Sequence, residues 1–186
     1  LFLTYNAGEQ DTGGTSRSQA LLWPITTGPY EFEFECDFSA AWTMLANGTA
    51  PALIWQLKPS DGSPSWNVSV DTSTADATQF TLQLGQRTSK AGSVTVRASV
   101  TIDPADVLSC KILGNFQYIN GWIEFYCNGV LRYSAYDVQT LVNDTASYHI
   151  PYGALYLYNN TYPSAPAPTR TISFKTMRVT KIGNLF

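Results

Sequence analysis

The chain has 186 residues, of which only 13% are charged, and a formal net charge of −3. This length fits a single domain with one sizeable core, so we expect one domain over residues 1–186. Basic residues are fewer than acidic ones, 11 against 14, so the sequence gives no sign of the basic surface expected of a nucleic-acid-binding protein. No stretch approaches the ~20 apolar residues of a membrane span.

Alternating apolar and polar residues recur along the chain and predict β-strands. The clearest case is Tyr30–Phe38, where aromatic side chains and Cys36 share one face and acidic side chains share the other. A strand over Ser16–Leu21 would place Arg17 and Gln19 on one face. Further strands are predicted at Leu53–Lys58, Phe80–Leu84, Ser93–Ile102, Trp122–Cys127, Tyr152–Tyr158 and Thr171–Val179.

Turn residues separate these strands. Asn128-Gly129 is a strong signal for a tight β-hairpin, because both residues tolerate positive φ. Short helical turns are expected at Asp103-Pro104 and from Asp137 to Leu141, each begun by a capping Asp. Many short strands with almost no helix predict an all-β sandwich of two antiparallel sheets, with jelly-roll topology and helix below about 10% of residues.

The apolar strand faces predict the core. The residues expected to be buried are Phe32, Phe34, Phe38, Leu53, Trp55, Ile123, Phe125, Leu155 and Leu157. Cys36 and Cys127 share strand faces with apolar neighbours and are expected inside. With Cys110 they make an odd count, which leaves two arrangements open: three buried thiols, or one disulfide and one thiol.

Metal ligands are sparse in the sequence. There is no Cys-x-x-Cys motif, and His149 is the only histidine, so we expect neither a zinc site nor another metal. His149 itself is open to two interpretations, a structural or surface residue and a functional one.

Four N-x-[S/T] sequons occur, at Asn47, Asn67, Asn143 and Asn159. They indicate secretion into a glycosylating environment, or else ordinary polar loops. The chain begins without a signal peptide pattern, so Leu1 is expected to start a mature or excised chain. Together these features predict an extracellular location, either secreted or on a virion surface.

Several strand faces carry polar and aromatic side chains in register. Gln56 and Lys58 share one face by alternation, Tyr156 and Tyr158 share another, and a third carries Trp122, Glu124 and Tyr126. Brought together on neighbouring strands, such faces would line a concave groove suited to a sugar polymer, with aromatic rings for C–H surfaces and polar groups for oxygens. The alternative for each strand is an ordinary solvated face.

Four segments carry a family resemblance. In order they are Arg17-Ser18-Gln19, Trp55-Gln56-Leu57-Lys58, the run from Asn120 to Gly129, and Tyr156-Leu157-Tyr158-Asn159-Asn160. This order resembles the jelly-roll polysaccharide lyases, including alginate and glucuronan lyases, within the concanavalin A-like lectin and glucanase superfamily. In alginate lyases one strand carries Arg-Ser-Glu, a second carries Gln-x-His, and a late strand ends in Tyr-Asn-Gln.

The chain departs from that pattern at three positions. Gln19 stands where the family has Glu, Lys58 where it has His, and Asn160 where it has Gln. Carboxylate-binding residues are thus better retained than those for proton transfer, so the resemblance implies sugar binding more fully than it implies activity. Asn159 is also a sequon, and a glycan there would block the site, so both interpretations of Asn159 cannot hold.

The resemblance implies β-elimination on a uronate. Arg17, Gln56 and Asn159 would neutralise the uronate carboxylate through hydrogen bonds. Tyr158 would serve as base or acid, with its phenolate favoured by a nearby cation, and Lys58 would serve as base only if desolvated. The scheme needs no cofactor and no metal. Tyr156, Trp122, Glu124 and Tyr126 are the further candidates for sugar contact.

Three functions follow as alternatives. The first is a secreted lyase acting on a uronate-containing polysaccharide. The second is a non-catalytic module that binds cell-surface glycans or receptors, as on a phage tail or virion, and the third is a structural jelly roll of a capsid or filament. The expected partner is a polysaccharide or cell-surface glycan, with homo-oligomerisation left open.

Overall fold

Two antiparallel sheets, each of six strands, make up the architecture of the described chain. The computed structural model describes residues 2–5, 16–26, 28–38, 52–58, 65–71, 80–89, 91–103, 105–142, 152–159 and 170–183. No helix occurs within these ranges, and the predicted all-β sandwich is confirmed. None of the described residues therefore lies in a helix long and apolar enough to cross a membrane.

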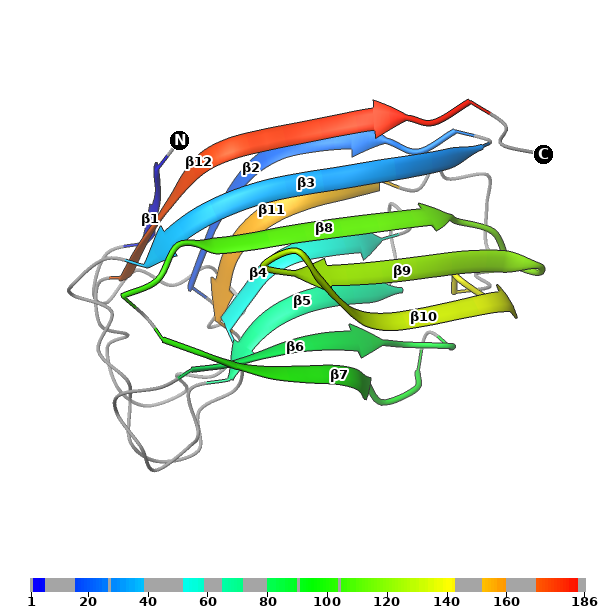
Figure 1. Cartoon of the computed structure of the whole chain (residues 1–186), viewed down its shortest axis with the longest axis horizontal. Helices are drawn as coiled ribbons and strands as arrows, with labels where there is room; N and C mark the ends of the chain where they lie inside the picture. Colours follow the sequence, from blue (N-terminus) through cyan, green and yellow to red (C-terminus); the bar gives the residue numbers. More distant parts are fainter. Residues whose placement is uncertain are drawn as a thin grey trace.

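The strands of each sheet come from distant parts of the chain (Figure 1). Sheet A runs in the order β1 (Phe2–Tyr5), β12 (Arg170–Lys181), β3 (Pro29–Phe38), β8 (Leu108–Asn115), β9 (Gly121–Cys127) and β10 (Val130–Val138). Sheet B runs in the order β2 (Ser16–Pro24), β11 (Tyr152–Asn159), β4 (Ala52–Lys58), β5 (Trp66–Asp71), β6 (Phe80–Gln86) and β7 (Thr95–Ile102). Strands that are far apart in sequence but adjacent in a sheet give the crossed connections of a jelly roll.

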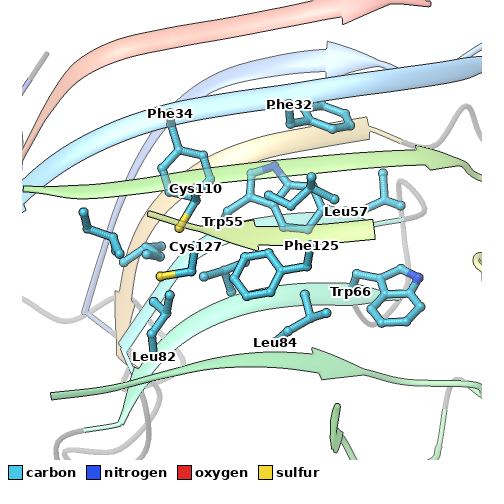
Figure 2. Close-up of a cluster of buried hydrophobic side chains, with 14 of the residues drawn as sticks. Phe32, Phe34, Trp55, Leu57, Trp66, Leu82, Leu84, Cys110, Phe125 and Cys127 are labelled. Carbon is cyan, nitrogen blue, oxygen red and sulfur yellow. The ribbon is translucent and has the colours of Figure 1, made fainter. Parts of the chain in front are cut away.

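Aromatic side chains fill the space between the sheets (Figure 2). The ring of Phe32, on β3 of sheet A, meets Trp55 of sheet B edge to face at 5.4 Å between centroids. Phe116 lies 5.9 Å from the same ring. The β11 backbone approaches so closely that a Cβ on Gly153 would lie 2.5 Å from Phe32 Cε1, so glycine is required there.

The predicted core is largely confirmed. Phe32, Phe34, Phe38, Trp55, Ile123 and Phe125 are all buried. Leu53 is a wrong prediction: it is only half-buried, while its neighbour Ile54 is fully buried. The register of β4 against β5 shifts between Leu53 and Trp55, and this β-bulge moves Leu53 to the other face. The side chains of Leu155 and Leu157 lie outside the described residues.

A second bulge, in β12, reverses which alternate residues of the strand face the core. The pairing of β12 with β3 shifts between Phe174 and Thr176. Phe174 is buried before the shift, Thr176 is exposed after it, and Met177 and Val179 then pack against the core. A strict period of two therefore fails along this strand, because the extra residue reverses the alternation.

The predicted hairpin is confirmed, and the predicted helical turns are not. Asn128 and Gly129 join β9 to β10 with φ of 49° and 74°. Asp137 begins no helix, since it lies within β10 with a φ of 55°. Asp103 does cap a single turn: its carboxylate accepts a hydrogen bond from the Ala105 N–H at 2.8 Å, and its carbonyl accepts one from the Asp106 N–H at 3.0 Å. Ala105 and Asp106 are not helical, and Pro104 lies outside the described residues.

All three cysteines are free thiols buried in the core, so the arrangement with one disulfide is wrong. Cys110 and Cys127 are direct cross-strand partners on β8 and β9, and Cys36 lies on the neighbouring strand β3. Burial raises the pKa of all three thiols above the usual range. The thiolate is the reactive form, so these cysteines behave as small apolar core residues.

Truncating a core aromatic tests the assignment of strand faces. Phe34→Ala and Phe125→Ala each remove a buried ring, and each should lower the free energy of unfolding by about 3–5 kcal/mol. Chemical denaturation measures this loss. Ile119→Ala is the control, because Ile119 is 71% exposed and its change should stay within about 0.5 kcal/mol. Losses under ~1 kcal/mol at both Phe34 and Phe125 would contradict the core described here.

The thiols provide an independent test of the same core. Because burial blocks access and raises each thiol pKa, native protein at neutral pH should react with a maleimide far more slowly than unfolded protein. Mass spectrometry of timed samples reads out the number of labels. Rapid modification of all three cysteines in the folded state would contradict their placement.

Candidate functional site

The outer face of sheet B, which points away from the core, carries polar side chains that are nonetheless buried. Gln56 on β4 is 6% exposed, and Asn67 and Ser69 on β5 are each 4% exposed. Trp55, Leu57, Trp66, Val68 and Val70 face the core, so alternation directs the intervening side chains outward. Three polar side chains gathered on one sheet face make this face the first candidate for ligand binding.

A ladder of cross-strand partners connects these residues. Gln56 lies opposite Asn67, and Asn67 lies opposite Gly85 of β6. A Cβ on Gly85 would lie 2.8 Å from Asn67 Oδ1 and 2.6 Å from Val94 Cγ1. Gly85 therefore leaves the space in which the Asn67 amide sits against the sheet.

Asn67 and Ser69 are candidate site residues that the sequence analysis missed. The alternation of Trp66, Val68 and Val70 in β5 could have revealed them, since it assigns Asn67 and Ser69 to the opposite face. In the sequence alone, Asn67 stands out only as a sequon. Its burial within a strand leaves no room for a glycan in the folded chain, so the glycosylation interpretation is wrong at this position.

The three strands expected to carry the site are direct neighbours in sheet B, in the order β2-β11-β4. Tyr158 lies opposite Arg17 on one side and Leu53 on the other. Tyr156 lies opposite Gln19, and Asn159 lies opposite Ser16. For Arg17, Gln19, Tyr156, Tyr158 and Asn159 the structure describes the backbone, and their side chains lie outside the description.

The β4 residues of the candidate site are better defined. Ala154 of β11 lies opposite Gln56, and Tyr152 lies opposite Lys58. Gln56 is buried and Lys58 is half-buried. Asn160 and His149 lie outside the described residues, as do the sequons at Asn47 and Asn143.

The expected grouping of all candidate residues on one face is corrected in one respect. Trp122, Glu124 and Tyr126 lie on β9 of sheet A, half-exposed on the face that points away from the core. Gln56 and Lys58 lie on sheet B, so the thickness of the sandwich separates the two groups. Alternation within a strand predicted the face of each group, but it carries no information about which sheet a strand joins.

Ligands for a metal ion are not brought together in the described parts of the chain. No three side chains among the described His, Cys, Asp and Glu residues lie close enough to hold one. On the outer face of sheet B, the described Gln56, Asn67 and Ser69 side chains offer uncharged hydrogen-bonding groups, and Lys58 adds a cation at the edge of the ladder. This chemistry suits a hydroxyl-rich or carboxylate-bearing ligand.

Comparison with known proteins identifies the fold. No family model matches the chain, and no curated protein matches it by sequence. Among solved structures, alginate lyase Aly36B superposes with a TM-score of 0.68 at 11% identity, over 98% of this chain and 80% of that protein. Alginate lyase PA1167 from Pseudomonas aeruginosa gives 0.58 at 14% identity, over 96% and 81%. The marine alginate lyase AlyA1 from Zobellia galactanivorans, of polysaccharide lyase family 7, gives 0.53 at 13% identity, over 86% and 64%.

The chain therefore has the jelly-roll fold of these polysaccharide lyases. At identities of 11–14% the similarity concerns the fold alone. What those enzymes act on remains a property of those enzymes.

Gly85→Ala tests the packing of Asn67 on the outer face of sheet B. The added methyl group would overlap the Asn67 amide and Val94, and we expect a loss of about 1–3 kcal/mol in the free energy of unfolding. Gly183→Ala is the matched control, because a Cβ there meets nothing within 4 Å. Equal stability of both variants in chemical denaturation would show that Asn67 is not held against Gly85.

Proposed function

We propose that the chain binds a uronate-containing polysaccharide across the outer face of sheet B and cleaves it by β-elimination. The observation that carries the proposal is the strand order β2-β11-β4, which makes the strands of Arg17, Tyr158 and Gln56 neighbours in one sheet and pairs Tyr158 with Arg17. The lyase-like fold supports the same conclusion. An extracellular location, where such polymers occur, accompanies it.

The strand register supports a shared face for the proposed residues. Gln56 lies opposite Ala154, and Tyr158 lies opposite Arg17. The register of β11 against β4 shifts between Leu155 and Tyr158, so alternation along β11 alone does not assign the face of Tyr158. Its partner Leu53 lies on the outer face after the β4 bulge, opposite Ser69, and this pairing supports the outer face for Tyr158 as well. Cross-strand partners share a face, which extends the assignment to Arg17, while Gln56 faces outward by alternation along β4. Lys58, two residues from Gln56, belongs to the same set.

The proposed chemistry begins with the uronate carboxylate. Hydrogen bonds from Arg17 and Gln56 neutralise it and stabilise the charge that develops when the C5 proton leaves. Asn159 follows Tyr158 directly in β11 and pairs with Ser16, so alternation assigns it to the other face and it takes no part in this step. The Tyr158 phenolate, favoured by the Arg17 cation at the paired position of β2, takes that proton. The electron pair of the C5–H bond forms the C4–C5 double bond, the C4–O4 bond breaks, and the Tyr158 phenol returns the proton to O4. Tyr156 contacts the neighbouring sugar.

A second candidate is glycan binding without catalysis. Lys58 replaces the histidine and Gln19 replaces the glutamate of the lyases that the chain resembles, while the proposed carboxylate-binding residues are retained. Such a chain would keep the groups that hold a uronate and lose groups that position or move protons. Turnover separates the two candidates, since both predict binding.

Ultraviolet absorbance provides the decisive measurement, because elimination creates a conjugated C4–C5 double bond. Polymannuronate, polyguluronate and polyglucuronate should be tested separately, and the proposal expects a rise with at least one. Tyr158→Phe should reduce the rate by roughly 10²–10⁴-fold while binding persists. Tyr118→Phe is the control, because Tyr118 is an exposed tyrosine outside sheet B.

Gln56→Glu tests the carboxylate contact. The substitution keeps the size of this buried side chain but turns it into an acceptor that repels a uronate, so binding and turnover should both fall. Thermal unfolding of each variant controls for stability. Binding of a uronate polymer with no absorbance change would favour the second candidate, and absence of both would refute both.

A further inference from the structure

The outer face of sheet A carries a second constellation, separate from the face proposed for the uronate. Trp122 of β9 and Tyr136 of β10 stack with ring centroids 6.3 Å apart and an interplanar angle of 24°. Trp122 is half-exposed and Tyr136 is 58% exposed. The two near-parallel rings pack against each other and together form an aromatic platform that is exposed to solvent.

Hydrogen bonds hold this platform in place. The Tyr126 hydroxyl donates to Glu124 Oε2 at 2.7 Å, and the Tyr136 hydroxyl donates to Glu124 Oε1. Lys111 Nζ lies 4.7 Å from the centre of the Tyr126 ring, a cation–π contact on the same face. The Glu124 carboxylate thus joins two tyrosines on neighbouring strands, and these rings lose little further freedom when a ligand arrives.

The same bonds determine which hydrogen-bonding groups remain free for a ligand. The hydrogen bond to Glu124, followed by partial desolvation and the carboxylate charge, raises the pKa of both Tyr126 and Tyr136. Both phenols consequently keep their protons and direct them at Glu124. The lone pairs of the phenol oxygens and the remaining lone pairs of the carboxylate are acceptors, so the constellation accepts hydrogen bonds from hydroxyl groups.

The surrounding charge disfavours an anion. The strand register places Glu31 of β3 opposite Leu113, and Leu113 opposite Glu124. Arg178 pairs with Glu31 and Glu33, so this cation is already engaged. Lys111 adds one further cation beside Tyr126, so Arg178 and Lys111 stand against the three carboxylates of Glu31, Glu33 and Glu124. A carboxylate-bearing sugar would therefore meet a net negative charge on this described part of sheet A.

We propose that Trp122, Tyr136, Glu124 and Tyr126 form a binding site for a neutral pyranose of a glycan. The C–H face of the sugar stacks on the aromatic pair, and its hydroxyl groups donate to Glu124 and to the tyrosine oxygens. The site lies on the opposite sheet from Gln56, so it does not depend on the proposed lyase activity. It would hold a neutral chain or branch while the other face handles uronate.

Titration calorimetry with neutral oligosaccharides tests the site. The probes are cellohexaose, laminarihexaose and mannohexaose, with an oligoguluronate as the anionic comparison. At least one neutral probe should bind with a dissociation constant on the order of 1 mM or below. Trp122→Ala and Tyr136→Ala should each weaken that binding at least about tenfold, because each removes half of the stacking platform.

Two controls keep the result specific. Tyr118→Ala removes an aromatic side chain that is 43% exposed outside the platform, and it should leave binding unchanged. Glu124→Gln keeps the size of the side chain but removes the charge, so neutral sugars should bind more weakly and the discrimination against oligoguluronate should fall. Far-UV circular dichroism confirms that each variant is folded.

Three outcomes would overturn the proposal. The first is that no neutral probe binds, and the second is that Tyr118→Ala weakens binding as much as Tyr136→Ala. The third is concentration-dependent dimerisation that Trp122→Ala and Tyr136→Ala abolish, which would assign the face to self-association instead.

Discussion

The close contact between the Phe32 ring and the β11 backbone at Gly153 is the constraint on which the candidate site depends. It joins a central strand of sheet A to a central strand of sheet B, with no space for even a methyl group between them. Trp55 meets the same ring from β4. The strands that carry Gln56 and Tyr158 are therefore held by their inner faces, and the outer face of sheet B inherits its geometry from the core.

Alternation divides the side chains of each central strand between a face that packs in the core and a face that points outward. In β4 and β5, burial of Trp55 and Trp66 commits one face to the core and leaves the other for Gln56 and Asn67. In β9, burial of Phe125 does the same for Glu124 and its neighbours. The sandwich therefore presents two outer faces that share no side chains, and a substitution on one face reaches the other only through the core.

The sequence predicts this fold well where the information is local and poorly where it is not. The strand at β3, its aromatic face and the Asn128-Gly129 hairpin follow from alternation and turn chemistry, which act between near neighbours. Leu53 was misassigned because a bulge depends on the partner strand β5, which alternation within β4 does not reveal. Trp122 and Gln56 lie on different sheets, although the sequence predicts them on one face. Pairing between distant strands decides which sheet a strand joins, and alternation within a strand does not reveal that pairing. The segments around Arg17, Gln56 and Tyr158 that resemble the lyases do lie on the neighbouring strands β2, β4 and β11, because a family resemblance carries long-range information that alternation lacks.

The two outer faces differ in the charged side chains that they carry. On sheet A, β3 directs Glu31, Glu33, Glu35 and Asp37 outward in a row. Lys175 lies 2.7 Å from Asp37, and Arg178 pairs with Glu31 and Glu33, so these cations offset part of the charge of the row and leave it net negative. A polyanion approaching the molecule is repelled by that row and meets Lys58 on sheet B instead. Because such steering acts before any specific contact forms, this difference in charge would favour the approach of a polyanion to sheet B over sheet A, as the two proposals require.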